Sequence, residues 1–128
     1  MAITLWKDKE SKKLEPTLFS VTAEQQAQAI GSEGNNINKS TQLRRYFEEV
    51  VRLNTQAKAK GADMDLILPQ VHMLVAKVVY AQGRRLVSSS FVEMMKSGIN
   101  QINDKDDLQV FANFFESFIG FYKMHGPK

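Results

Sequence analysis

Basic residues at helical spacing are the feature of this sequence best suited to binding chemistry. Gln70, Lys77 and Arg84 stand seven residues apart, and Arg45 and Arg52 repeat that spacing in an earlier segment. Residues seven apart lie nearly above one another on a helix, so each set predicts a polar line. Two such lines on one side of the fold would form a groove for a phosphate backbone, without any need to read bases.

Three more basic residues join these candidates: Lys39, Arg44 and Arg85. A plainer role is open to several of these cations. Glu48 and Glu49 lie three or four residues from Arg44, Arg45 and Arg52, so they could form ion pairs with them within one helix. Arg84 and Arg85 stand at the end of a predicted helix, where positive charge complements the helix dipole. Exposed pairs contribute only about 0.3–0.5 kcal/mol, which is too little to exclude a competing phosphate.

Residues suited to catalysis or metal binding are few. The sequence has no Cys, only two histidines, His72 and His125, and no glycine-rich phosphate loop, metalloprotease motif or serine-hydrolase motif. Asp104, Asp106 and Asp107 resemble part of a calcium loop but lack its glycine and closing glutamate. We expect these acids to begin a helix instead. The sequence therefore predicts no catalytic residue, no metal site and no cofactor.

Charge is unevenly placed along the chain of 128 residues, which is long enough for one domain. The net charge is only +3, but residues 39–100 hold ten Lys and Arg against five Asp and Glu. That excess indicates an anionic partner, although ordinary scatter of surface charge explains it equally well. No secretory signal is recognisable, and polar residues interrupt the longest apolar stretch, 66–81, so we expect a cytoplasmic protein with no membrane partner.

The elements that must position these residues are helical. Apolar residues at helical spacing, without strand-like alternation, predict an all-α fold: a single-domain compact bundle of about five helices. Residues 1–21 are charged and unpatterned, which predicts a flexible or loosely docked N-terminal arm, followed by a helical domain at 22–128. Helices are expected over about 22–30, 41–59 and 65–82, from about 90, and over about 105–124.

Two details of these helices are also predicted. Ser40 and Ser90 are expected to cap the second and fourth helices, and Gly83 is expected to end the third. Twelve of the sixteen residues from Leu66 to Ala81 are apolar. We therefore expect the third helix to be the central one, buried nearly all round.

An aromatic run marks the last helix. At helical spacing such a run usually belongs to the core, but Phe114 and Phe121 widen it beyond one face and are themselves seven apart. They could form a second seam that contacts a neighbouring subunit. An internal core is favoured for the run, and a subunit interface at Phe114 and Phe121 is the alternative.

Three segments carry a family resemblance: KSTQLRRYF at 39–47, KVVYAQGR at 77–84 and FANFFESFIGFYK at 111–123. In this order and spacing the chain resembles, over about residues 22–124, the Csm small subunit of type III-A CRISPR–Cas effector complexes. The resemblance implies a non-catalytic helical subunit in antiviral defence that stacks as a minor filament and lines the channel holding guide RNA and target RNA. Its implied partners are those RNAs, the backbone and large subunits, and further copies of itself. The oligomeric state of the isolated chain stays open, and a dimer is one alternative because its partner faces are exposed outside the complex.

The resemblance also assigns residues. Lys39, Arg44, Lys77 and Arg84 match its basic motif positions, and Glu116 is expected to pair internally with one of the basic groups. Neighbouring cations are added on charge and spacing. The full set predicted to bind the RNA backbone is Lys39, Arg44, Arg45, Arg52, Lys77, Arg84 and Arg85.

Two functions from other classes stay open at this point. A helix-turn-helix DNA-binding regulator would use residues 83–96 as its turn and recognition helix. A purely structural helical adaptor would use Phe114 and Phe121 as its interface and its charges only for solubility.

Overall fold

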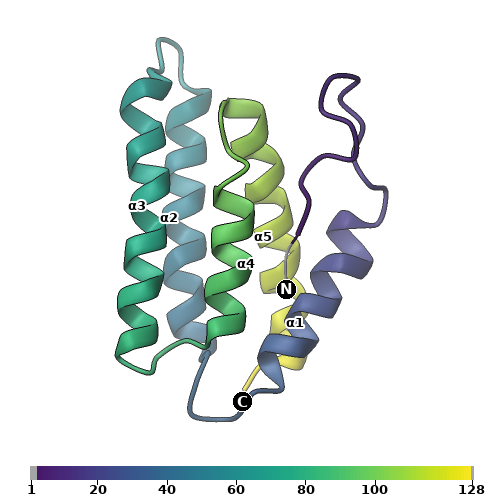
Figure 1. Cartoon of the computed structure of the whole chain (residues 1–128), viewed down its shortest axis with the longest axis vertical. Helices are drawn as coiled ribbons and strands as arrows, with labels where there is room; N and C mark the ends of the chain where they lie inside the picture. The colour runs from purple at the N-terminus through teal and green to yellow at the C-terminus, as the bar shows by residue number, and fades with distance from the viewer. Residues whose placement is uncertain (1–2, 128) are drawn as a thin grey trace.

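The computed structural model describes residues 3–127, and within this range the helices are α1 Ala23–Gly31, α2 Ser40–Lys58, α3 Met64–Gly83, α4 Ser89–Ile99 and α5 Lys105–His125. A π-helical turn, Leu18–Thr22, leads directly into α1. Extended pairing among these residues is limited to one bridge between Asp8 and Lys13. The all-α bundle of five helices predicted from the sequence is confirmed (Figure 1).

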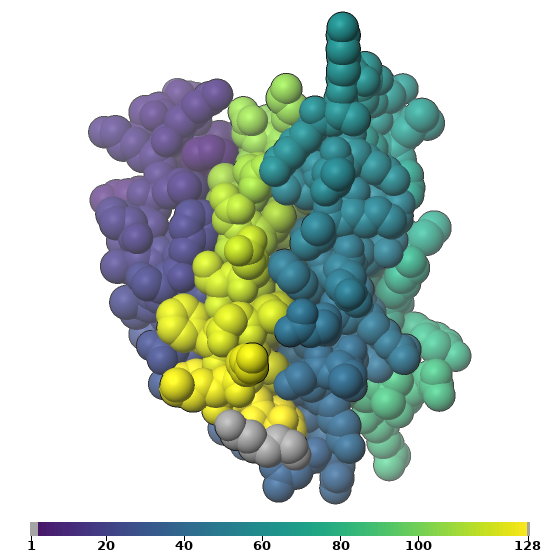
Figure 2. Space-filling view, turned by 180° about the vertical axis from the view of Figure 1, so that it is seen from behind, coloured from purple at the N-terminus to yellow at the C-terminus, as the bar shows by residue number. Residues whose placement is uncertain are grey.

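The centre of the bundle is α5, which packs between α1 and α2. Figure 2 shows the same arrangement from behind, with α5 in yellow running between the N-terminal segments and α2. The rings of α5 contact Phe91 of α4, whose centroid lies 6.4 Å from those of Phe115 and Phe118. The aromatic run of α5 therefore forms the core, as favoured from its spacing.

α3 is an edge helix, so the prediction that it is central and buried nearly all round is wrong. Its buried residues form one stripe that packs towards α2 and α4: Ile67, Val71, Leu74, Val78 and Ala81. Leu66 and Tyr80 are exposed instead. Apolar composition leads to burial only where a neighbour covers each face, and in residues 3–127 the outer face of α3 has none (Figure 1).

α3 is long and apolar enough to cross a membrane when length and composition alone are considered, even though polar residues interrupt its sequence. In the bundle its apolar stripe packs against α2 and α4. Lys77 is exposed in the same helix, and a lysine inside a bilayer would be costly. α3 therefore fits a bundle helix that packs on one face and exposes the other to solvent.

The helix ends differ in detail from the predicted caps. α2 begins at Ser40, but its N-cap is Lys39 in an extended conformation, with no side-chain cap. α4 is capped by Ser88 rather than Ser90, because the Ser88 hydroxyl accepts a hydrogen bond from the Phe91 N–H at 3.4 Å. Both shifts are short and leave the faces of the helices as predicted.

The first part of the arm contacts the end of α4 and the start of α5, and the arm then loops over to α1 (Figure 1). Ile3 and Leu5 are buried in the core, and the Ile3 N–H donates to Ser97 Oγ at 2.9 Å. The Leu5 N–H donates to Gln101 Oε1, also at 2.9 Å. The division into an arm at 1–21 and a helical domain at 22–128 stays a prediction, and residues 1–2 and 128 lie outside the described range.

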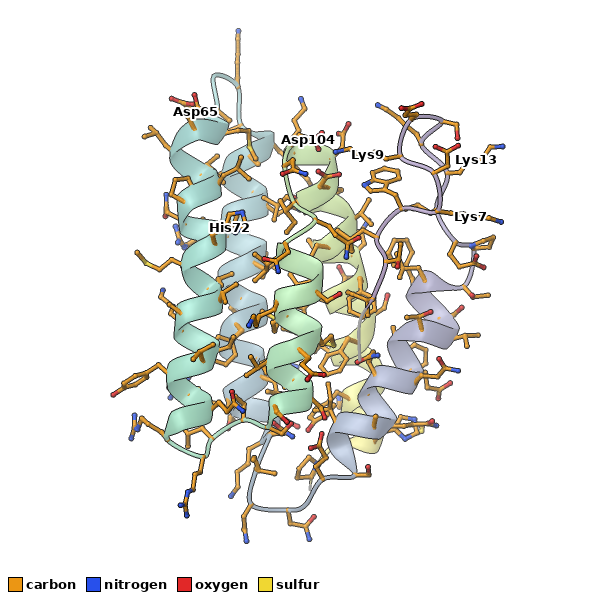
Figure 3. All side chains as sticks on the ribbon, viewed as in Figure 1. Lys7, Lys9, Lys13, Asp65, His72 and Asp104 are labelled. Carbon is orange, nitrogen blue, oxygen red and sulfur yellow. The ribbon has the colours of Figure 1, made fainter. Side chains whose placement is uncertain are left out.

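Asp107 anchors this arm to the start of α5. Its carboxylate is 0% exposed and accepts hydrogen bonds from Trp6 Nε1 at 2.7 Å, Lys9 Nζ at 2.8 Å and the Asn103 N–H at 2.8 Å. Burial alone would raise the pKa of Asp107, but the hydrogen bonds from Lys9, Asn103 and Trp6 outweigh it and lower that pKa. Figure 3 shows Lys9 beside Asp104, whereas Lys7 and Lys13 point outwards.

Candidate nucleic-acid interface

A groove runs between α2 and α3 on the outer side of the bundle. It has a volume of about 590 Å³ and contains three of the predicted RNA-binding residues: Arg45 from α2 and Lys77 and Arg84 from α3. All three are exposed, and none forms an ion pair within residues 3–127. The lines predicted from seven-residue spacing therefore meet at one surface.

Helix geometry explains why these side chains share one groove. Met73, Lys77, Tyr80 and Arg84 follow steps of four, three and four residues, so they lie on one face of α3. The buried stripe turns another face of the helix towards the bundle. The composition of the groove is therefore mixed, with a basic line beside apolar and aromatic groups.

Arg52 lies two turns beyond Arg45 on α2, but it already has an internal partner. Its guanidinium forms an ion pair with Glu49 at 2.5 Å and contacts Gln70 Oε1 of α3 at 3.5 Å. The hydrogen bond from Arg52 lowers the pKa of Glu49 against the opposing effect of partial burial, and the charge of Lys77 adds to the lowering. The plainer explanation, pairing within the helix, therefore holds for Arg52.

Two predicted residues lie on a different surface. Arg44 lines a hollow of about 220 Å³ between α2 and α5, together with Lys123. Lys39 lines an adjoining hollow with Asn35. Arg44 and Arg45 are neighbours in sequence, so they point about 100° apart around the helix and cannot serve one groove. Lys123, the last residue of the third motif, is the cation that sequence reasoning left out of the set.

Arg85 has an unusual backbone conformation at the end of α3. Its φ is +63°, in the left-handed region that glycine adopts most readily. The Arg85 N–H donates to Gln82 O and the Leu86 N–H donates to Ala81 O, each at 2.9 Å, which is the hydrogen-bond pattern of a Schellman motif. α3 ends at Gly83 as predicted, but the residue that reverses the chain is Arg85.

Asn38 joins three parts of the chain beneath this end of the groove. It is fully buried, and its side-chain amide donates to Ile30 O at 3.2 Å and Ser88 Oγ at 3.0 Å and accepts from the Ser88 N–H at 2.8 Å. Its own N–H donates to Leu86 O at 3.0 Å, and its carbonyl accepts from the Tyr122 hydroxyl at 2.5 Å. The sequence indicated only a loop here.

The hydrogen bonds of Asn38 hold the backbone directly next to two basic segments. Lys39 follows Asn38 directly, and Arg84 and Arg85 precede Leu86. Burial raises the pKa of Tyr122, with a smaller contribution from the charge of Glu33, so its hydroxyl stays a donor at neutral pH. The basic segments at this end of the bundle are therefore held by paired polar groups, among which the Ser88 hydroxyl also donates to Glu33 Oε1 at 3.2 Å.

The structure separates the two residues of the proposed subunit seam. Phe114 is 0% exposed inside the core, so in this conformation its side chain has no surface to offer a partner. Phe121 is half-buried and lines a shallow hollow with Phe19. A subunit interface at these positions stays a prediction, and its accessible part is at Phe121.

Other residues singled out from the sequence have ordinary surroundings. Glu116 is exposed and forms no ion pair within residues 3–127, so the expected internal pairing is absent from the structure. His72 is exposed on α3 (Figure 3), and His125 Nε2 lies 3.1 Å from Glu24 Oε2. Residues 3–127 contain no group of three or more His, Cys, Asp or Glu residues arranged to hold a metal ion.

Fold and groove together define a small all-helical protein with a basic outer face, and comparison with known proteins places it in a family. The family model described as Csm2 Type III-A matches residues 17–128. The chain belongs to this Csm2 family, and it is therefore a small subunit of a type III-A CRISPR effector complex. The resemblance inferred from the three sequence motifs is confirmed.

A curated relative agrees with this assignment. The Streptococcus thermophilus protein named "CRISPR system Cms protein Csm2" is 23% identical over 99 residues, which cover 76% of this chain and 80% of the relative. No solved structure matches the chain.

Proposed function

We propose that this subunit binds the backbone of the guide RNA–target RNA duplex without sequence specificity, and that it does so as a non-catalytic, cytoplasmic component of the effector complex. The observation that supports this most strongly is the groove between α2 and α3. Arg45, Lys77 and Arg84 converge there from two helices, and none of the three forms an ion pair within residues 3–127.

Exposed cations that form no ion pair suit phosphate binding. Each one that neutralises a phosphate releases condensed counterions, which supplies affinity independent of base sequence. Guide sequences differ from one complex to another, so a general subunit has to respond to A-form shape, phosphates and 2′-hydroxyls. Long, flexible lysine and arginine side chains on rigid helices meet that need.

The modest charge of the chain fits action in several copies. A net charge of +3 gives one molecule little electrostatic attraction for RNA. Copies stacked side by side in a minor filament would present several grooves to one duplex, and their combined affinity would far exceed that of one copy. We infer the backbone and large subunits as neighbours of this filament, and a dimer as one state of the isolated chain.

The helix-turn-helix alternative gains no support from the fold. α4 would have to be the recognition helix, but six of its eleven residues are buried: Phe91, Val92, Met94, Met95, Gly98 and Ile99. A recognition helix needs an accessible face to enter the major groove. α4 instead supplies core contacts to α5.

The proposal is tested by the salt dependence of target-RNA binding in the assembled complex. Replacing Lys77 and Arg84 together with alanine should lower the slope of log affinity against log salt by about one unit for each lost phosphate contact. A matched control, Lys58→Ala with Lys60→Ala, removes the same charge from exposed positions at and just beyond the end of α2. An unchanged slope in the groove variant, or an equal change in the control, would contradict the proposal.

A further inference from the structure

Tyr80 is the feature of the groove that phosphate binding leaves unexplained. Its side chain is 68% exposed, although a large aromatic residue on a helix is ordinarily covered. It lies in the lining of the groove with Lys77 and Arg84, and Met73, 57% exposed, lies on the same side. A phosphate backbone needs cations and hydrogen-bond donors but no aromatic face.

The ring of Tyr80 is already associated with a cation. The guanidinium carbon of Arg84 lies 5.9 Å from its centroid, within the range of a cation–π contact. Such a contact limits the motion of both side chains while leaving the rest of the ring accessible. Ala76 and Ala81 line the same groove with short side chains, which leaves room for a flat ligand beside the tyrosine ring.

We propose that Tyr80 stacks against one unpaired RNA base, while Lys77 and Arg45 bind the phosphates on either side of it. This inference rests on the proposed RNA-binding function of the groove and adds the kind of nucleotide it takes. A nucleobase has a planar π-face, and stacking on an aromatic side chain is independent of base identity. Bases inside a continuous duplex offer no such face, so the ligand has to be an unstacked nucleotide.

Charge favours RNA over a protein segment as the occupant of this groove. Its lining contains three cations, Arg45, Lys77 and Arg84, and no carboxylate. An apolar protein segment would leave those cations buried without partners, which is costly. A nucleotide supplies both an apolar face and a negative charge within one residue.

The first test compares Tyr80→Phe and Tyr80→Leu in the assembled complex, measuring target-RNA affinity over a salt series. Loss of one stacking contact should weaken binding about fivefold or more in Tyr80→Leu, whereas Tyr80→Phe should stay within about twofold because the ring is retained. The salt slope should not change in either variant, since no cation is removed. This separates the inference from the phosphate contacts, whose loss changes the slope.

Three results would overturn the inference. Wild-type affinity in Tyr80→Leu would show that no stack forms, and equal losses in both variants would show that the hydroxyl is used instead. If Tyr80→Leu lowers the amount of this subunit in the purified complex, the tyrosine serves a protein interface. Because Tyr80 is mostly exposed, either variant should keep the fold, which circular dichroism would verify.

A second test locates the base. Target RNAs that carry one abasic nucleotide at successive positions are bound to the wild-type and Tyr80→Leu complexes. At the position facing Tyr80, removal of the base should weaken wild-type binding about fivefold or more and leave the variant unaffected. If the two complexes respond alike at every position, no base stacks on Tyr80.

Discussion

Basic side chains have different roles at the two edges of this bundle, one formed by the N-terminal arm and the other by α2 and α3. At the edge formed by the N-terminal arm, Lys9 pairs with Asp107 at 2.8 Å and with Asp104 at 3.3 Å. At the edge formed by α2 and α3, Lys77 and Arg84 form no ion pair within residues 3–127. Lys9 therefore ties the arm to the start of α5, whereas Lys77 and Arg84 of the groove are available to a ligand.

The comparison shows that charge alone does not identify a binding residue. The arm has four lysines within residues 7–13, yet two of them, Lys9 and Lys12, have carboxylate partners at the start of α5. Those same acids lie at the positive end of the helix dipole, which also favours them there. A cation can bind RNA readily only where the fold leaves it without such a partner.

The largest effect is expected from breaking the arm edge at Asp107. Replacing Asp107 with alanine removes the acceptor for the Trp6 indole and the Asn103 N–H, and leaving such donors unpaired should cost about 2 kcal/mol of stability. Urea denaturation would measure the loss. RNA affinity of the assembled complex should stay at the wild-type value, and a large change there would mean that the arm edge also serves RNA.

A smaller change in stability, this time a gain, is expected from replacing Arg85 at the groove edge. The left-handed backbone of Arg85 costs a non-glycine residue roughly 1–2 kcal/mol, and glycine relieves this while gaining entropy in the unfolded chain. Arg85→Gly should therefore raise the free energy of unfolding by about 0.5–1 kcal/mol.

The matched control for this change is Arg85→Ala, which removes the same charge without relieving the backbone. Both variants should alter RNA binding equally if the guanidinium contacts phosphate, and only the glycine variant should be more stable. If glycine and alanine give equal stability, the conformation of residue 85 carries no strain.

The smallest effect is a response of the arm to acid. Because the pKa of Asp107 is lowered in the folded chain from an ordinary value of about 3.9, its stabilising effect is complete above that value. It is lost as the pH falls through the lower, folded pKa. Trp6 is the only tryptophan of the chain, so its fluorescence should report release of the arm below about pH 4.

Asp107→Asn is the control for this titration, because an amide at this position does not change its charge with pH. The acid transition of Trp6 should be absent from that variant. A transition at the same pH in both proteins would assign it to another group.

The helices and the groove were accessible to sequence reasoning because they depend on local periodicity. Spacing of seven placed Lys77, Arg84 and Arg45 correctly on facing lines, and the aromatic run of α5 correctly indicated core. Composition failed for α3, because an apolar helix at the edge of a small bundle buries one stripe and exposes the rest. Which face is covered depends on neighbours that one segment does not specify.

Contacts between distant segments account for what was missed. Asn38 and Ser88 are fifty residues apart, and Trp6 and Asp107 are farther apart still. No spacing rule connects such pairs before the fold is known. The division of the predicted basic set also depends on helix rotation, since Arg44 faces α5 while Arg45 faces α3.

The most direct test of the account compares one lysine from each edge. Lys77→Ala and Lys9→Ala are the same chemical change, and each is measured in the assembled complex as the slope of log target-RNA affinity against log salt. The slope should fall by about one unit for Lys77→Ala and stay unchanged for Lys9→Ala. An unchanged slope for Lys77→Ala, or an equal fall for both, would contradict it.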